Sequence, residues 1–82
     1  MRSVDEKYKY NEKRGGAFGN GYCFAVRWYR DYPKMDNETK KVFKEYIDGQ
    51  RELAKYSDMQ DAKGFMCGIR DAANERKSRK GK

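Results

Sequence analysis

The sequence predicts an α+β domain in which an N-terminal β-hairpin with a long glycine-rich loop packs on two C-terminal α-helices. Three observations lead to this prediction. Aromatic and polar residues alternate near the start of the chain, which is typical of strands. A glycine-rich stretch between two such segments indicates a turn. In the second half, apolar residues recur at helical spacing.

The predicted hairpin covers residues 5–30, and its first strand begins with the sequence D-E-K-Y-K-Y. Lys7 and Lys9 alternate there with Tyr8 and Tyr10. In a strand, successive side chains point to opposite faces of the sheet. We therefore expect this strand to have one lysine face and one tyrosine face.

A loop is expected over residues 11–21, N-E-K-R-G-G-A-F-G-N-G, because glycine and asparagine accept positive φ at little cost. The second strand is expected over residues 22–32, which are rich in aromatic side chains. We expect one face of this strand to lie in the core, and that face holds Phe24, Val26 and Trp28.

The first helix is expected to follow Pro33, which ends the second strand because it lacks the N–H that a ladder needs. Asp36 or Asn37 is its expected N-cap, and the helical spacing continues to about residue 55. Gly49 costs about 1 kcal/mol relative to alanine inside a helix, so we expect a neighbouring segment to approach closely there. The expected core face holds Phe43, Tyr46, Ile47 and Leu53.

A second helix is expected from Asp58 to about Arg76, because Ser57 and Gln60 match the capping-box pattern. Its apolar face should add Phe65, Met66 and Ile69 to the core. The alternative is a third strand over residues 64–70, where two glycines weaken a helix.

A stripe of small residues lies along this second helix, since Gly64, Gly68 and Ala72 are four residues apart. Such a stripe lets two helices approach closely. We interpret it as internal packing, and the alternative is the seam of a homodimer.

The length of 82 residues predicts a single domain, which we place at residues 1–76, followed by a basic, disordered tail over residues 77–82. No apolar run reaches the roughly 18 residues of a membrane span. The first residues also lack the apolar core of a signal peptide. We therefore expect a cytoplasmic protein that does not enter a membrane.

Catalytic chemistry finds little support in the composition. The chain contains no histidine, which is the commonest general base. Cys23 and Cys67 are too few for a disulfide framework or a four-ligand zinc site, and their apolar neighbours indicate buried, reduced thiols. The glycine-rich stretch lacks the G-x-x-x-x-G-K-[ST] pattern of a phosphate-binding loop. We therefore predict no enzyme activity, no metal site and no cofactor.

Charge is distributed unevenly in this basic chain, which has 20 Lys and Arg residues against 13 Asp and Glu and a net charge of +7. Residues 1–34 hold eight basic and four acidic side chains, and residues 64–82 hold six and two. The segment between them holds six and seven. Both ends are therefore basic, and a basic surface attracts anionic partners, of which nucleic acid is the commonest.

Aromatic side chains outnumber aliphatic ones, with seven Tyr, four Phe and one Trp against six Val, Ile and Leu residues together. So small a chain cannot bury all of these rings, so some should lie on the surface or in an interface. Eight of the twelve rings lie in the first 32 residues, between Lys and Arg residues.

Exposed rings that stack on bases, beside cations that hold phosphates, are the features by which proteins bind single-stranded nucleic acid. The sequence therefore predicts a small protein that binds DNA or RNA through the basic, aromatic hairpin and its loop. The predicted binding residues are Lys7, Tyr8, Lys9, Tyr10, Lys13, Arg14, Phe18, Arg27 and Arg30.

Two short segments resemble parts of nucleic-acid-binding families. K-Y-N-E-K-R-G-G-A-F-G, residues 9–19, resembles the binding strand of cold-shock domains, but no aromatic residue follows directly after its Lys-Gly equivalent. G-Y-C-F, residues 21–24, resembles a fragment of the aromatic motif of RNA-recognition folds, but Arg27 stands where the last aromatic residue belongs. Each match covers about a tenth of the chain, so neither assigns a family.

The alternative function is that of a small protein-binding regulator or inhibitor, of the accessory kind that phages and mobile elements encode. Tyr, Trp, Met and Arg are the residues enriched at the centres of protein interfaces. Salt separates the two hypotheses, because nucleic-acid binding weakens steeply between 50 and 200 mM salt and docking through an aromatic patch does not.

Overall fold

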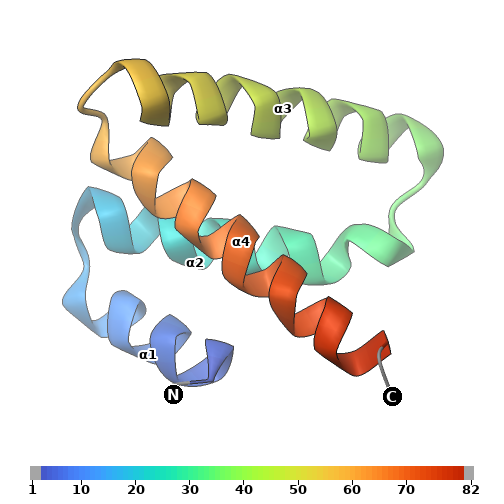
Figure 1. Ribbon diagram of the computed structural model, residues 1–82, viewed down its shortest axis with the longest axis horizontal. Helices are drawn as coiled ribbons and strands as arrows, with labels where there is room; N and C mark the ends of the chain where they lie inside the picture. Colours follow the sequence, from blue (N-terminus) through green and yellow to red (C-terminus); the bar gives the residue numbers. More distant parts are fainter. Residues whose placement is uncertain (1–2, 81–82) are drawn as a thin grey trace.

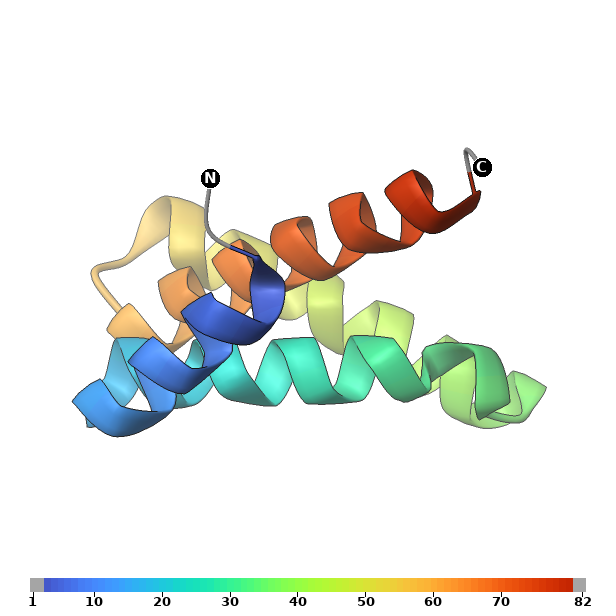
Figure 2. The same cartoon turned by 90° about the horizontal axis from the view of Figure 1, so that it is seen from below.

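The computed structural model describes residues 3–80, and within them the chain forms four α-helices and one short 3₁₀ helix (Figure 1). The elements in chain order are α1 (Val4–Arg14), α2 (Gly16–Asp31), η1 (Tyr32–Lys34), α3 (Asn37–Tyr56) and α4 (Gln60–Lys80). Consecutive α-helices run in opposite directions, and α4 crosses obliquely over α2 (Figures 1 and 2). The contact between α2 and α4 is the most extensive in this helical bundle.

The predicted α+β fold is wrong, because residues 3–80 contain no strand and the first predicted strand is part of α1. Local signals favour this helix. The Ser3 hydroxyl accepts a hydrogen bond from the Glu6 N–H and caps the N-terminus. Acidic Asp5 and Glu6 occupy the first turn, and basic Lys13 and Arg14 occupy the last, so both ends complement the helix dipole.

The expected loop over residues 11–21 is reduced to a tight turn between α1 and α2. Only Gly15 and Gly16 have positive φ, at 69° and 78°. Gly19 and Gly21 lie inside α2, where each faces the backbone of another helix. Of the four glycines that indicated a loop, two therefore form the turn and two serve as packing positions.

The second predicted strand is α2, and its buried positions follow a helical period. Phe24 and Trp28 are four residues apart and share one face, which is partly exposed. Val26 is buried on another face. Ala25, which would lie on the other face of a strand, is buried as well, and Cys23 is buried as its apolar neighbours indicated.

Small residues let α2 and α4 approach closely, and this explains why α4 is a helix despite its glycines. A Cβ atom added to Gly68 would lie 2.6 Å from the Tyr22 carbonyl oxygen. One added to Gly64 or Gly21 would lie closer still to a backbone oxygen of the facing helix. The internal-packing interpretation of the small-residue stripe is confirmed, and the alternative of a third strand over residues 64–70 is wrong.

The predicted helix after Pro33 is confirmed as α3, and its N-cap is Asp36. The Asp36 carboxylate accepts a 2.7 Å hydrogen bond from the Thr39 N–H. Hydrogen bonding from the Thr39 side chain, and then from this N–H, lowers the pKa of Asp36. The second predicted helix is confirmed as α4, although it begins at Gln60 rather than Asp58. It continues through residues 77–80 of the segment expected to be disordered, while residues 81 and 82 lie outside the described residues.

The core lies where α2, α3 and α4 meet, and its buried hydrophobic residues are Tyr22, Cys23, Ala25, Val26, Phe43, Ala62, Phe65, Ile69 and Ala72. Tyr46 and Leu53 were expected there but are 45% and 37% exposed. No other segment approaches Gly49, where an added Cβ would meet nothing within 4 Å, so that expectation was also wrong. No described helix is long and apolar enough to cross a membrane.

Candidate functional site

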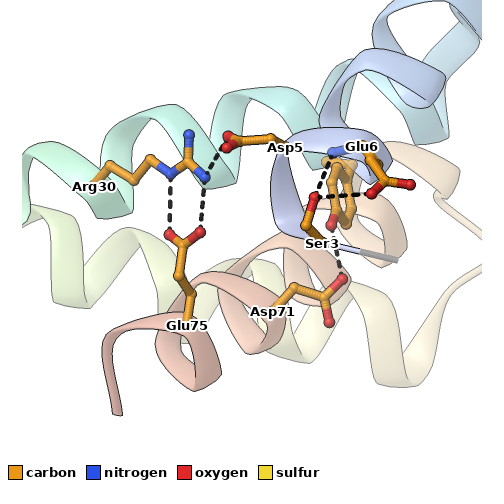
Figure 3. Close-up of polar contacts among 7 residues, drawn as sticks. Ser3, Asp5, Glu6, Arg30, Asp71 and Glu75 are labelled. Carbon is orange, nitrogen blue, oxygen red and sulfur yellow. Dashed lines mark hydrogen bonds and ion pairs between the residues drawn. The ribbon is translucent and has the colours of Figure 1, made fainter. Parts of the chain in front are cut away.

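Two of the cations predicted to bind nucleic acid instead pair with carboxylates of α4. Arg30 makes a two-pronged ion pair with Glu75, at 2.9 and 3.2 Å, and its Nη2 also lies 2.8 Å from Asp5 (Figure 3). Lys7 lies 3.4 Å from Asp71, which also accepts a 2.7 Å hydrogen bond from a buried tyrosine hydroxyl. These contacts tie α1 and α2 to α4.

Four more predicted residues contact one another across the first two helices. Arg27 donates a 3.0 Å hydrogen bond to the Tyr8 hydroxyl, which raises the pKa of Arg27. The Arg14 guanidinium lies 5.4 Å from the centre of the Phe18 ring, at the turn between α1 and α2. The first contact holds α2 against α1, and the second lies beside the turn that joins these two helices.

Lys9, Tyr10 and Lys13 are the remaining predicted residues, and all three are exposed on α1. The nine predicted residues therefore lie in α1, in α2 and at the turn between them, and they face α4, each other or solvent. Lys9, Tyr10 and Lys13 share an exposed stretch of α1, whereas Lys7 and Arg30 are engaged with carboxylates of α4.

A different set of rings is exposed together where α2 meets α3. We call it the aromatic face, and it consists of Phe24 and Trp28 from α2 with Val42 and Tyr46 from α3. These four side chains are between 37% and 64% exposed. They belong to the two most amphipathic segments of the chain, yet they lie outside the buried core.

Ring contacts hold the aromatic face in place. The Phe24 and Trp28 rings stack with their centres 5.2 Å apart, and Phe24 also lies 6.0 Å from Tyr46. Beneath them, Trp28 stacks on buried Phe43 at 6.1 Å, and Tyr46 meets buried Phe65 edge-on at 5.3 Å. Because each exposed ring rests on a core ring, a partner that binds here finds the rings already positioned.

A hollow of about 240 Å³ lies in the centre of the aromatic face. Its lining consists of the four residues of the face with Thr39 and Phe43. No described charged side chain takes part in the lining. Such a hollow can accept an apolar side chain.

The groove between α3 and α4 is lined partly by charged side chains, and two of its rings, Tyr29 and Tyr32, also contact an arginine. Arg76 lies 4.4 Å from the centre of the Tyr29 ring and 5.7 Å from that of Tyr32. Lys44 and Arg51 line the same groove. The aromatic face is therefore the better candidate for binding a separate molecule.

Sequence reasoning missed this face because it assigned Phe24, Trp28 and Tyr46 to the core. Two signals pointed to it. The excess of rings indicated that some must be exposed, which the structure confirms. Phe24 and Trp28 are also spaced by four residues, which places them on one face of a helix.

Both cysteines are free thiols, and Cys23 is buried. Burial raises the pKa of the Cys23 thiol, which opposes its use as a nucleophile. In comparisons with known proteins, the chain matches no protein-family model, no curated protein and no solved structure.

Proposed function

We propose that this chain is a small protein-binding module that docks on another protein through the aromatic face. The observation that carries the proposal is the exposure of Phe24, Trp28, Val42 and Tyr46 around a hollow without charged lining. With large side chains each burying roughly 150–250 Å² in full, the exposed parts amount to about 300 Å² of contiguous apolar surface. The largest apolar patch of a small protein is typically about 300–600 Å² and is often functional, so a patch of this size is compatible with an interaction site.

The residue types also fit a protein interface. Trp and Tyr supply most of the binding energy in protein interfaces when a partner excludes water from them. Here Trp28 and Tyr46 are half-exposed and held by core rings, so binding requires little ordering of the side chains.

Nucleic-acid binding, the function predicted from the sequence, stays a prediction that no structural finding tests. Two observations favour the protein partner over it. Lys7, Arg27 and Arg30 already hold intramolecular partners. The exposed rings of the aromatic face are bordered on α3 by Glu38, Lys41 and Glu45, so two carboxylates that repel phosphates stand there against one cation.

The proposal can be tested by photo-crosslinking in the cells that express the protein. A crosslinking amino acid replaces Val42, which is 64% exposed, and in a control it replaces exposed Asn74 on α4. We expect a discrete protein adduct from position 42 that position 74 does not give. The adduct should disappear when Trp28→Ser is added to the position-42 variant. Equal adducts from both positions, or none from position 42, would contradict the proposal.

A further inference from the structure

The aromatic face continues along α3 as an exposed seam with coiled-coil spacing. The seam consists of Thr39, Val42, Tyr46, Gly49, Leu53 and Tyr56, which are separated alternately by three and four residues. All six are exposed. This 3-4 spacing is the pattern by which one helix packs lengthwise against another. The seam extends about 26 Å at 1.5 Å per residue.

The core uses mainly the neighbouring stripe of the same helix, so much of the seam surface is left open to solvent. Phe43, Ile47 and Ala54 directly follow seam residues in the sequence and lie about 100° further round the helix. Phe43 is buried, and Ile47 and Ala54 are half-buried. The inward-facing part of α3 is thus packed within residues 3–80, whereas the seam stays exposed along its length, although Tyr46 contacts Phe24 and Phe65.

Three glutamates border the seam on the side away from the core. Glu38, Glu45 and Glu52 are seven residues apart, and each directly precedes a seam residue. All three are exposed, and none makes an ion pair within the described part of the chain. They form an acidic edge on a chain whose net charge is +7.

Gly49 lies in the middle of the seam, at a cost of about 1 kcal/mol relative to alanine that no internal contact explains. An added Cβ there would meet no atom of residues 3–80 within 4 Å. Without a Cβ, the α3 backbone is open to close approach by a second helix from outside, as the α2 and α4 backbones are to each other at their glycines.

From these observations we infer that the partner presents an amphipathic α-helix with Lys or Arg along one flank, which lies in the seam of α3 beside Phe24 and Trp28. Its apolar stripe covers the seam, and its cations meet Glu38, Glu45 and Glu52. This inference rests on the proposed function and names the partner's chemistry. A second copy of this chain fits less well, because two antiparallel seams would set glutamates against glutamates.

The test is a displayed library of 21-residue helical peptides, selected against the full chain. The peptides carry fixed apolar residues at coiled-coil spacing, and their flanking positions vary among Lys, Gln and Glu. We expect the selected peptides to carry Lys on the flank that meets the glutamates. Binding is then measured through the emission of Trp28, the one tryptophan of the chain, which lies in the contact.

Matched variants separate the charge effect from the apolar contact. In the combined Glu38→Gln, Glu45→Gln and Glu52→Gln variant, Lys peptides should bind about tenfold more weakly, since three exposed ion pairs are lost. A Gln-flanked peptide should bind this variant and the unaltered chain equally. Gly49→Ala should also weaken the Lys peptides while leaving the melting temperature as high or higher.

Each of the other possible results contradicts a different part of the proposal. If peptides bind without a charge preference, and Val42→Lys abolishes that binding, the basic partner is wrong but the aromatic face remains a docking site. If no peptide is selected, the helical partner is wrong, and the photo-crosslinking result decides the proposed function by itself. If light scattering shows a dimer that Val42→Lys dissociates, the seam binds a second copy instead.

Discussion

The loss in free energy of unfolding when an aromatic ring is removed depends on how deeply the ring is buried. Phe65 and Trp28 illustrate a large and a smaller loss. Phe65 is 2% exposed and touches the rings of Phe24, Phe43 and Tyr46. Trp28 is larger but 40% exposed. We expect Phe65→Ala to lower the free energy of unfolding by about 3–5 kcal/mol, and Trp28→Ala by roughly half as much.

Urea unfolding followed by circular dichroism measures both values. If Phe65→Ala proves unfolded, Phe65→Leu gives a smaller, measurable loss. A larger loss for Trp28→Ala than for Phe65→Ala would place Trp28 in the core and would remove one ring from the proposed docking surface.

Tyr22 carries the clearest pH dependence in the molecule. It is buried, and its hydroxyl donates a 2.7 Å hydrogen bond to Asp71. Burial and this hydrogen bond raise the pKa of Tyr22 above its ordinary value near 10. Above that pH the unfolded chain releases the phenolic proton while the folded chain retains it, so stability falls as pH rises, by at most about 1.4 kcal/mol per pH unit.

Tyr22→Phe should therefore change stability in two ways. At neutral pH the free energy of unfolding should fall by about 1.5–3 kcal/mol, because Asp71 loses a hydrogen bond. Between pH 9 and 11 the variant should lose less stability than the unaltered chain. Urea titrations at a series of pH values measure both effects. Tyr56→Phe, at a position that is 76% exposed, is the control, because the alkaline loss that it shares with the unaltered chain comes from other groups such as lysines. Parallel alkaline losses in all three proteins would exclude this role for Tyr22.

At the scale of the elements, glycine has opposite effects at two helical positions. Gly64 faces the Phe18 carbonyl so closely that an added Cβ would clash with backbone. Gly49 faces open space. Gly64→Ala should therefore lower the melting temperature or prevent folding, whereas Gly49→Ala should raise the free energy of unfolding by about 0.5–1 kcal/mol. Thermal melts of the two variants measure the contrast, and a stabilising Gly64→Ala would contradict the close α2–α4 contact.

The same contrast explains which elements could be predicted from sequence. Helix α3 has a cap at Asp36 and a clear helical period, so local signals and packing agree and the helix was predicted correctly. In α2, aromatic residues and glycines favour strands and turns locally, and only the contact with α4 reverses that preference. The segments around Gly21 and Gly64 touch although they are more than forty residues apart in the sequence. Such a contact leaves no signal in the local sequence of either segment.

The candidate site was predictable only in part, for a related reason. An excess of rings over the available core could be counted from the sequence, and it indicated an exposed aromatic surface. Which rings are exposed depends on the stripe of α3 that packs inward. Because Phe43 and Tyr46 belong to one broad apolar face, the sequence could not show that the first is buried and the second half-exposed.

At the scale of the whole molecule, a net charge of +7 and the aromatic face predict different binding behaviour. A basic surface binds any nucleic acid weakly, and such binding falls steeply with salt because it depends on the release of counterions. Docking through apolar rings buries surface without releasing many ions, so it depends little on salt. A charged chain can therefore give a positive nucleic-acid assay even when its function is to bind a protein.

We accordingly expect labelled single-stranded RNA and duplex DNA to bind at 50 mM salt and to be released at 200 mM, in fluorescence-polarisation titrations. Variants in which Tyr8, Tyr10 and Arg14 are replaced by Ser should differ little from the unaltered chain, because Tyr8 is half-buried under Arg27 and Arg14 lies on Phe18. The complex with a protein partner should instead persist at 200 mM and be lost in Val42→Lys. Nucleic-acid binding that stays tight at 200 mM and is lost in the Ser variants would establish the sequence-based prediction in place of the docking proposal.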